Sequence, residues 1–520
     1  MTLKNTDTKK FGIDFSSFRV ILLSALIIRL IAAVFSEGYG MHDDHFLVIE
    51  ASTSWVDGYD YNGWLPWSKG NRGAPEGHSF TYVGLNYFFF YTFKFFGIAD
   101  PKILMLLNRL AHALFSMLVV YFGFKITEKI SNRKNAVTVG WILALLSIIP
   151  FLSVRNLVEL SSIPFLIWGV WLMVKNDSKI NIFYAGLLIG LAVSFRYQIA
   201  IFAIGIMFYY LLIFDYKTLF KGPFKSFVRT LIDQKFVSFS FGTFVTFLIT
   251  QGLVDYCIWG KPFAEFKAYS TYNIQEGVLY LPNTNYFMYV FVLLGVLLFP
   301  FGLLVGIGFI RSAKKHLMLF IPVMLFILFH TFYPNRQERF ILSVLPFFII
   351  LGIIGFQELR KKPFWDKLWK FSYSFFWILN IPTLLFVSVT YTKMSRVESM
   401  YTLYSDNLVD ERILLEGSAD TKTSMLPKFY SGSWYCTFLE RNDSVQPLDV
   451  VPGARYDYIF FFGEEKLPKR IKSYKKLFPK LTLVKKCYPS LMDQLVKKLN
   501  PRNSNQYIEV WRTYEPIAKK

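Results

Sequence analysis

Two adjacent carboxylates stand a few residues after the first long apolar run. They are Asp43 and Asp44, with His42 and His45 on either side. Neighbouring carboxylates repel one another, and at the mouth of an apolar bundle they would also be partly desolvated. Both effects raise a carboxylate's proton affinity, which suits a general base. The same residues could begin a helix, where Asp is favoured, or hold a divalent metal, although neighbours in a short loop seldom supply a full coordination shell.

An aromatic and polar mixture follows the acidic pair. Such mixtures are typical of surfaces that stack sugars and fix hydroxyl groups, and an aromatic belt at a membrane interface looks the same. The candidate binding residues in this stretch are Glu50, Tyr59, Tyr61 and Arg72.

Arginines recur at ends of apolar runs that we place on the same side as the acidic pair. Positive charge on the outer side of a membrane protein runs against the usual bias. We therefore expect an anionic partner, and a lipid-linked phosphate suits guanidinium groups because they bind it bidentately and neutralise the charge of a phosphate leaving group. The alternatives are lipid-headgroup anchors or ion pairs with Glu159 or Glu338. The candidates are Arg109, Arg155, Arg196, Arg336 and Arg339, with Glu338 inside the last cluster.

A further polar loop, residues 255–285, contains Gly260, Lys261 and Tyr280. Polar residues at the rim of a membrane bundle often line a substrate pocket. Nothing in this loop is diagnostic alone, so Tyr280 enters as a candidate binding residue only.

The composition indicates that membrane-spanning helices position these residues. Of 520 residues, 53% are hydrophobic and only 18% are charged, and the mean hydropathy is +0.36. Apolar stretches of roughly 18 to 25 residues recur, the length that crosses a hydrocarbon core as a helix. A net charge of +21 would suggest nucleic acid in a soluble protein, but here Lys and Arg gather in short links between apolar runs, as membrane orientation requires. We predict a polytopic membrane protein with no nucleic-acid partner.

The pattern predicts an all-α bundle of about eleven transmembrane helices with the N-terminus inside, because the basic links then fall alternately on the cytoplasmic side. The run 81–98 is predicted as an interfacial or re-entrant helix, since counting it as a span would misplace Lys125 to Lys134. An odd count puts the C-terminal tail outside. The expected spans are 18–35, 103–124, 136–153, 157–174, 180–195, 197–215, 236–254, 286–310, 317–333, 340–357 and 368–391.

The tail has a different composition, with more charged and turn-forming residues and no run long enough to span. Short strands are predicted at Tyr456 to Phe462, Leu481 to Lys485 and Tyr507 to Trp511. We therefore divide the chain into a transmembrane domain, 1–392, with an external first loop at 37–102, and a small soluble extracytoplasmic α/β domain, 393–520.

In their order and spacing, these pieces resemble the C-type glycosyltransferase (GT-C) superfamily, and within it the mannosyltransferases that use dolichyl-phosphate-mannose to build lipid-linked oligosaccharides and glycosylphosphatidylinositol anchors. Those enzymes show an acidic pair after the first span in a Pro-Asp-Glu-His-Trp-like stretch, then a glutamate and a Gly-Tyr-x-Tyr element. Here Asp43 to Phe46, Glu50 and Gly58 to Tyr61 follow that pattern. The family's His-Lys-Glu-x-Arg-Phe motif is echoed by Asn335 to Phe340.

Further parts of the chain look like the family's Gly-Lys loop and its Tyr-Gly-x-x-Pro-like turn before a span, namely Gly260-Lys261 and Tyr280 to Asn285. The sequence also departs from the pattern. Asp44 stands where the family has glutamate, and Asn335 and Gln337 replace a histidine and a glutamate.

The resemblance implies an inverting transfer, expected to be of mannose, from a polyprenyl- or dolichyl-phosphate carrier to a glycan or glycolipid acceptor, without nucleotide donor, metal or other cofactor. Asp43 would be the base and Asp44 would orient the acceptor or share the proton. Arg336 and Arg339 would hold the carrier phosphate. The protein would lie in a plasma or inner membrane, or in an endoplasmic reticulum membrane, with its active site extracytoplasmic or lumenal.

Two other functions stay open. A lipid-linked glycan flippase or other transporter would usually place ionisable groups at mid-membrane and often shows an internal repeat, whereas here the polar groups cluster at one face. A surface polysaccharide polymerase shares the multispan plan and would be expected to use a lipid-pyrophosphate donor.

Overall fold

The computed structural model describes residues 9–10, 13–68, 75–219, 233–275, 285–406, 411–418, 421–441, 456–500 and 505–514. The chain divides into two compact units. The first, here called the helical unit, comprises Met1–Ala33, Gly63–Gly84 and Arg109–Ser388; the second, the mixed unit, comprises Val34–Asn62, Leu85–Asn108 and Val389–Lys520. Compactness does not tell which residues lie in a membrane, so the expected boundary between 392 and 393 stays a prediction.

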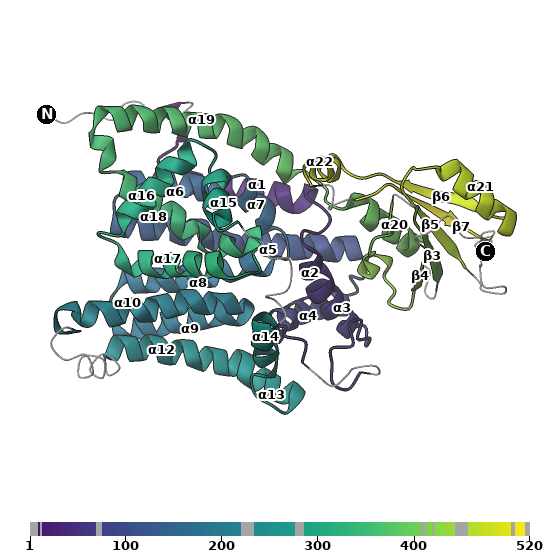
Figure 1. Cartoon of the computed structure of the whole chain (residues 1–520), viewed down its shortest axis with the longest axis horizontal. Coiled ribbons are helices and arrows are strands. Elements are labelled where there is room, and N and C mark those ends of the chain that lie inside the picture. Colours follow the sequence, from purple (N-terminus) through teal and green to yellow (C-terminus); the bar gives the residue numbers. More distant parts are fainter. Residues whose placement is uncertain are drawn as a thin grey trace. The chain divides into compact units, whose positions relative to one another are not determined.

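The helical unit is built from helices, most of which run alongside one another (Figure 1). Several begin at a polar cap in the links between apolar runs. Asn132, Ser178 and Asp233 accept backbone N–H groups at the starts of α6, α9 and α12, which satisfies donors that the first turn leaves open. The principal helices before the tail, of which most of α4 and the start of α5 belong to the mixed unit, are α1 Phe18–Phe35, α4 Phe80–Phe95, α5 Pro101–Ile130, α6 Arg133–Leu145, α7 Ile148–Ser153, α8 Val158–Lys175, α9 Lys179–Phe195, α10 Ala200–Leu219, α12 Gln234–Phe247, α13 Val254–Trp259, α14 Ala264–Gln275, α15 Met288–Val296, α16 Phe301–Ser312, α17 Leu317–Phe332, α18 Leu345–Phe356 and α19 Pro363–Ser388.

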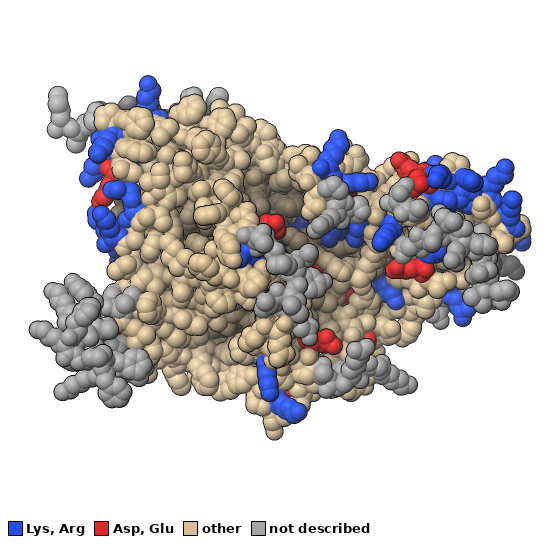
Figure 2. Space-filling view, in the orientation of Figure 1, with Lys and Arg blue, Asp and Glu red and all other residues tan. Residues whose placement is uncertain are grey.

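Six helices among the described residues are long and apolar enough to cross a membrane, and one bent pair would make a seventh. On the side shown in Figure 2, the helical unit presents a broad surface that is almost free of charged side chains. The chain is therefore an integral membrane protein of mostly helical fold. The count of about eleven spans and the inside location of the N-terminus stay predictions. The six are Phe18–Phe35, Pro101–Ile130, Val158–Lys175, Gln234–Trp259, Glu338–Lys361 and Pro363–Ser388.

The expected span at 286–310 is not one straight helix, and whether the segment crosses the membrane stays a prediction. The structure has two helices here, α15 and α16, which meet at an angle of 115°. Pro300 has no N–H to donate to a preceding turn, and Leu298 adopts a φ of 59°, which an α-helix does not contain. The apolar composition of the segment concealed this break.

The mixed unit contains a five-stranded sheet in the order β4-β3-β5-β7-β6. Strands β3 to β5 are parallel, and β7 lies antiparallel between β5 and β6. The sheet and its helices confirm the expected small α/β fold at the C-terminus. The elements are β3 Arg412–Glu416, β4 Thr437–Arg441, β5 Tyr458–Phe462, β6 Thr482–Cys487 and β7 Ile508–Arg512, with α20 Met394–Ser405, η6 Lys428–Ser431, α21 Leu467–Leu477 and α22 Leu491–Leu499.

The sheet is covered on both faces. Helix α21 packs on one face through a cluster that includes Leu467, Tyr474 and Trp511. The other face forms a second cluster in which strand residues join α20, η6 and the segment after α1, represented by Met400, Phe429 and Phe46. The segment after α1 and the tail therefore share one hydrophobic core.

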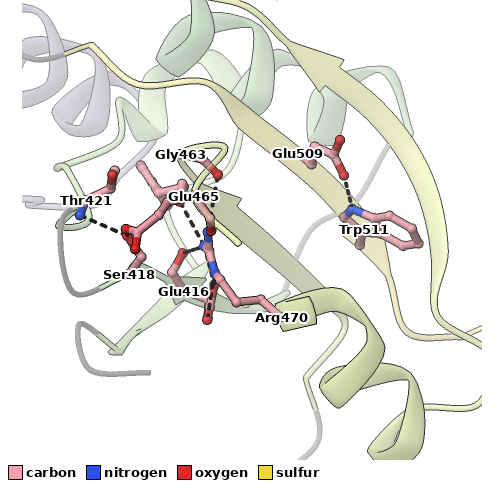
Figure 3. A network of polar contacts seen from close by, with 9 residues as sticks. Glu416, Ser418, Thr421, Gly463, Glu465, Arg470, Glu509 and Trp511 are labelled. Carbon is pink, nitrogen blue, oxygen red and sulfur yellow. Dashed lines mark hydrogen bonds and ion pairs between the residues drawn. The ribbon is translucent and has the colours of Figure 1, made fainter. Parts of the chain in front are cut away.

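A buried arginine fixes α21 to the sheet (Figure 3). The guanidinium of Arg470 donates to Glu416 Oε2 from Nη2 at 2.5 Å and from Nε at 2.9 Å. It also donates to the carbonyl oxygens of Phe462, Gly463 and Glu465. Because a buried charge needs both a counter-charge and filled hydrogen-bond positions, this network holds the start of α21 at the ends of β3 and β5.

Candidate active site

The acidic pair lies at the start of a helical segment, not in an irregular loop. Helix α2, His42–Asp44, continues into a π-helical turn, η1, His45–Glu50, and then into α3, Ala51–Val56. Asp43 is exposed and Asp44 is buried. Carboxylates in a first helical turn are stabilised by the N–H groups there. The expectation that these residues begin a helix is confirmed, although Met41 and not an aspartate occupies the N-cap.

His45 and Glu50 are both buried and face protein partners. The His45 ring stacks on Tyr39 at 4.3 Å and on Tyr430 at 5.7 Å between centroids. Its Nε2 lies 3.5 Å from Glu50 Oε1, which also accepts the N–H of Phe429 at 3.0 Å. Burial lowers the pKa of His45, and Glu50 acts in the opposite direction. These contacts hold the acidic helix against the tail.

The segment that follows α1 and leads into the acidic helix pairs with the start of the tail. Gly38 and Thr392 form a parallel bridge, and Thr392 Oγ1 donates to the carbonyl of Tyr39 at 2.9 Å. Gly38 has a φ of +81°, and a Cβ there would lie 1.8 Å from the Thr392 carbonyl oxygen. Only glycine fits such an approach without backbone movement.

Two basic residues of the tail act electrostatically on His42, the residue just before the acidic pair. Lys393 Nζ donates to the carbonyl of Gly40 at 2.7 Å and sits 4.2 Å above the Tyr39 ring. Burial lowers the pKa of His42; Asp43 opposes this, while Lys393 and Arg396 add to it. The neighbourhood of His42 and Asp43 is thus more positive than the local sequence suggests. Sequence reasoning missed both cations because 350 residues separate them from the motif.

Tyr59 and Tyr61 pack on aromatic side chains of the tail. Tyr59 meets Tyr435 at 5.5 Å and Tyr61 meets Trp434 at 5.9 Å between centroids. Burial, with a further contribution from Glu50, raises the pKa of Tyr61 well above its ordinary value. Tyr61 is therefore a neutral phenol at physiological pH.

In the helical unit, two of the predicted arginines meet at one carboxylate. Arg196 Nη2 lies 3.0 Å from Glu159 Oε1, and Arg339 Nε lies 3.7 Å from the same oxygen. Glu159 is buried at the start of α8. The ion-pair alternative with Glu159 is confirmed for both arginines, and it also brings two guanidinium groups from distant parts of the chain together.

The other predicted residues of this unit have separate surroundings. Arg336 is buried, donates from Nε to the Thr331 carbonyl at 2.8 Å and lies 4.4 Å over the Tyr286 ring. Arg155 is buried against the ring of Phe151 at 4.7 Å. Glu338 is exposed at the start of the 3₁₀ segment η4, Glu338–Val344.

The acidic helix and the arginines belong to different compact units. The common cavity that the expected transfer reaction would need is therefore a prediction. Arg72 and Tyr280 lie outside the described residues.

Within the described ranges, no three His, Cys, Asp or Glu side chains are grouped closely enough to hold a metal ion.

A pair of buried carboxylates in the helical unit was not predicted. Glu265 accepts the N–H groups of Gly77, His78 and the Trp259 indole at 2.7, 3.0 and 2.8 Å. Asp255 accepts the N–H of Glu265 at 2.9 Å. Burial raises the pKa of Glu265 to about 7, against the effect of the bound N–H groups. The pair ties the end of the first loop to α14, and nothing in the local sequence marks it.

Three comparisons place the chain among known proteins. A family model described as the Alg9-like mannosyltransferase family matches residues 20–412. The apo crystal structure of ArnT from Cupriavidus metallidurans covers 96% of this chain and 99% of its own, with a TM-score of 0.55 and 11% identity. ArnT bound to undecaprenyl phosphate gives the same coverage, a TM-score of 0.56 and 12% identity. At this identity the likeness shows the fold alone, which is the GT-C fold. A search of curated proteins by sequence finds no match.

Proposed function

Because the chain belongs to the Alg9-like mannosyltransferase family, a family of membrane glycosyltransferases, we propose that it transfers mannose from a polyprenyl- or dolichyl-phosphate carrier to a hydroxyl group of a glycan or glycolipid. The observation that carries this proposal is the extent of the family match. It runs from residue 20 to 412 and so includes the acidic helix, Glu50 and the arginine turn at 336–339.

A lipid-phosphate donor is supported by the fold relative. ArnT, which shares its fold with this chain over 96% of the length, has been solved with undecaprenyl phosphate. For this chain we assign the carrier phosphate to Arg336 and Arg339. Arg196 would act with Arg339, because both contact Glu159. Guanidinium groups suit the role, since they keep their charge and bind two phosphate oxygens at once.

The reaction needs one base and one stabilised leaving group. Asp43 accepts the proton of the acceptor hydroxyl while the hydroxyl oxygen attacks the anomeric carbon from the face opposite the phosphate. The bond from that carbon to the phosphate oxygen breaks, and its electron pair leaves with the lipid phosphate. A single displacement inverts the anomeric configuration. The leaving group is already a good anion, so charge stabilisation by arginine matters more than its protonation.

The residues around Asp43 would position it. Asp44, the next residue of the helix, is buried, and His45 and Glu50 join the helix to the tail through Tyr430 and Phe429. Lys393 and Arg396 add positive charge near His42, the residue that precedes Asp43. We place this site on the extracytoplasmic or lumenal side.

A donor panel tests the proposal. The full chain, reconstituted in lipid nanodiscs, is offered polyprenyl-phosphate mannose, glucose and arabinose derivatives together with a mixture of membrane glycolipid acceptors. Mass analysis should show a hexose added to one acceptor, with mannose preferred, and product stereochemistry opposite to that of the donor. Transfer only from nucleotide sugars, or retention of configuration, would contradict the proposal.

A further inference from the structure

The last helix of the described tail presents an exposed row of leucines. In α22, Leu491, Leu495 and Leu499 are 72%, 44% and 79% exposed. Their spacing of four residues puts them on one face of the helix. Ser490 and Asp493 form a capping box at its start, so the N-terminus of this helix is fixed by side-chain hydrogen bonds.

The opposite face of α22 is fixed to the start of α20. Asp493 is buried and accepts the N–H groups of Lys393 and Met394 at 2.8 and 3.2 Å. It also accepts a hydrogen bond from Asn505 Nδ2 at 3.0 Å. Because Asp493 lies roughly half a turn from the leucine row, these bonds set the rotation of α22 and keep the leucines outward.

The chain also fixes how far α22 can lie from a candidate membrane span. Helix α19 is such a span and ends at Ser388. Only residues 389–393 separate it from Met394, and a peptide of that length reaches at most about 20 Å. Since Asp493 binds the N–H of Met394 directly, the start of α22 must lie within about that distance of the end of the span.

We propose that α22 is an interfacial membrane helix. Its leucine row enters the boundary between headgroups and acyl chains, and Lys498, which is exposed beside that row in the last turn, pairs with phosphates of anionic lipids. Amphipathic helices with an apolar row and flanking lysines bind in this way, and the lysine stems reach from the apolar boundary to the headgroups. This inference does not depend on the transferase activity.

Spin labels on the full chain test the placement. Single cysteines replace Leu495 or, as the matched control, the exposed Gln494 of the same helix, in a Cys257→Ser background; the other two cysteines are buried. In nanodiscs of phosphatidylethanolamine and phosphatidylglycerol, the label at 495 should collide more with oxygen than with a water-soluble nickel chelate, and the label at 494 should show the reverse. If the labels at both positions collided more with the nickel chelate than with oxygen, the proposal would be overturned. Low access of both reagents at 495 would indicate cover by protein, such as a second copy, and would also overturn it.

The role of Lys498 is tested separately from that of the leucines. With the label at 495, Lys498→Glu should shift collisions from oxygen towards nickel in nanodiscs containing phosphatidylglycerol, and Lys497→Glu, on the opposite face of the helix, should shift them less. The shift caused by Lys498→Glu should be smaller in nanodiscs of phosphatidylcholine alone. An equal shift in both kinds of nanodisc, or none in either, would overturn the pairing with anionic lipids.

Discussion

Asp43 and Asp44 are neighbours in the sequence but have different surroundings. Each residue of a helix is turned by roughly 100° from the one before it, so Asp43 is exposed while Asp44 is 6% exposed. A base must reach the proton that it accepts. This difference favours Asp43 as the base and gives Asp44 a supporting role.

Replacing Asp43 by asparagine should reduce transfer by roughly 10²–10⁴-fold, because an amide cannot accept the acceptor's proton. Turnover of lipid-phosphate sugar by the purified variant measures the loss. Asp177→Asn is the matched control, since Asp177 is an exposed carboxylate paired with Lys235, and it should keep normal activity. If Asp43→Asn retained more than about a tenth of the activity, the general-base role would be excluded.

Arg339→Ala should weaken use of the lipid donor. Loss of hydrogen bonds to a charged group costs about 1.5–3 kcal/mol, or roughly 10- to 100-fold in kcat/KM for the donor. Arg339→Lys should recover part of this, because it keeps the charge without the bidentate fork. Initial rates at varied donor concentration and fixed acceptor concentration measure the effect of both substitutions. Arg133→Ala, at an exposed arginine paired with Glu128, is the control; donor kinetics unchanged in Arg339→Ala would remove that residue from the phosphate site.

At the scale of elements, α20 is held by a carboxylate between two lysines. Glu398 binds Lys102 Nζ at 2.5 Å and Lys485 Nζ at 2.7 Å, and it accepts the Tyr391 hydroxyl at 2.9 Å. Burial opposes ionisation, but the two ammonium groups outweigh it and hold the pKa of Glu398 below its ordinary value. The helix that begins beside the acidic site is thus fixed by charge as well as by packing.

This arrangement predicts an acid-sensitive docking of α20. A carboxyl group whose pKa is lower in the folded state stabilises the fold above its unfolded pKa and loses that contribution as the pH falls through the folded pKa. Hydrogen exchange of α20 amides, corrected for the intrinsic pH dependence of exchange, should rise as the pH falls below about 4.5. Glu398→Gln should remove this step and lower protection at neutral pH, whereas Glu464→Gln, at an exposed position, should change neither. An unaltered acid step in Glu398→Gln would refute the assignment.

The attachment of α21 to the sheet depends on Arg470. Removing one partner of a buried ion pair leaves the other charge unpaired, so Arg470→Ala should lower the free energy of unfolding of the tail by roughly 3–5 kcal/mol. Lys469→Ala, at the exposed neighbouring position, should stay within about 0.5 kcal/mol. Denaturant-dependent hydrogen exchange of β3 and β5 in the full chain measures both. Equal effects of the two substitutions would show that the network contributes little.

At the scale of the whole molecule, local sequence patterns predicted many of the helices and strands, but they could not predict contacts between residues far apart in the chain. The run Tyr458–Phe462 is fully buried and was predicted as a strand from its composition. The sequence did not predict strands β3 and β4. Strand β4 is mostly exposed and has no alternation of buried and exposed residues that marks a strand. The break at Pro300 was hidden in an apolar run.

The candidate site shows the same division. The acidic pair and the arginine turn are recognised from residue types and order, and Glu159 is one of the two carboxylates that the sequence offers as alternative ion-pair partners. The bond from the Phe429 N–H to Glu50 joins residues 379 positions apart, and no pattern near either residue predicts it. Lys393 and Arg396 were missed for the same reason.

The orientation of the molecule can be tested with one pair of variants. If the tail is extracytoplasmic, Lys472→Cys should react with a membrane-impermeant maleimide added to intact cells, since Lys472 is exposed in α21. Lys314→Cys, in the basic link after α16, should react only after permeabilisation, because that link is predicted to be cytoplasmic. A Cys257→Ser background removes the exposed native thiol. The opposite labelling pattern would reverse the predicted topology.

The bridge between Gly38 and Thr392 has a consequence for biosynthesis. The ribosome completes the acidic helix early, but the backbone that pairs with its entry is made some 350 residues later. A nascent chain that has already inserted its first helix must therefore wait for its last span before this region can close. A chain that ends before residue 392 could therefore insert its first helix but could not form this bridge.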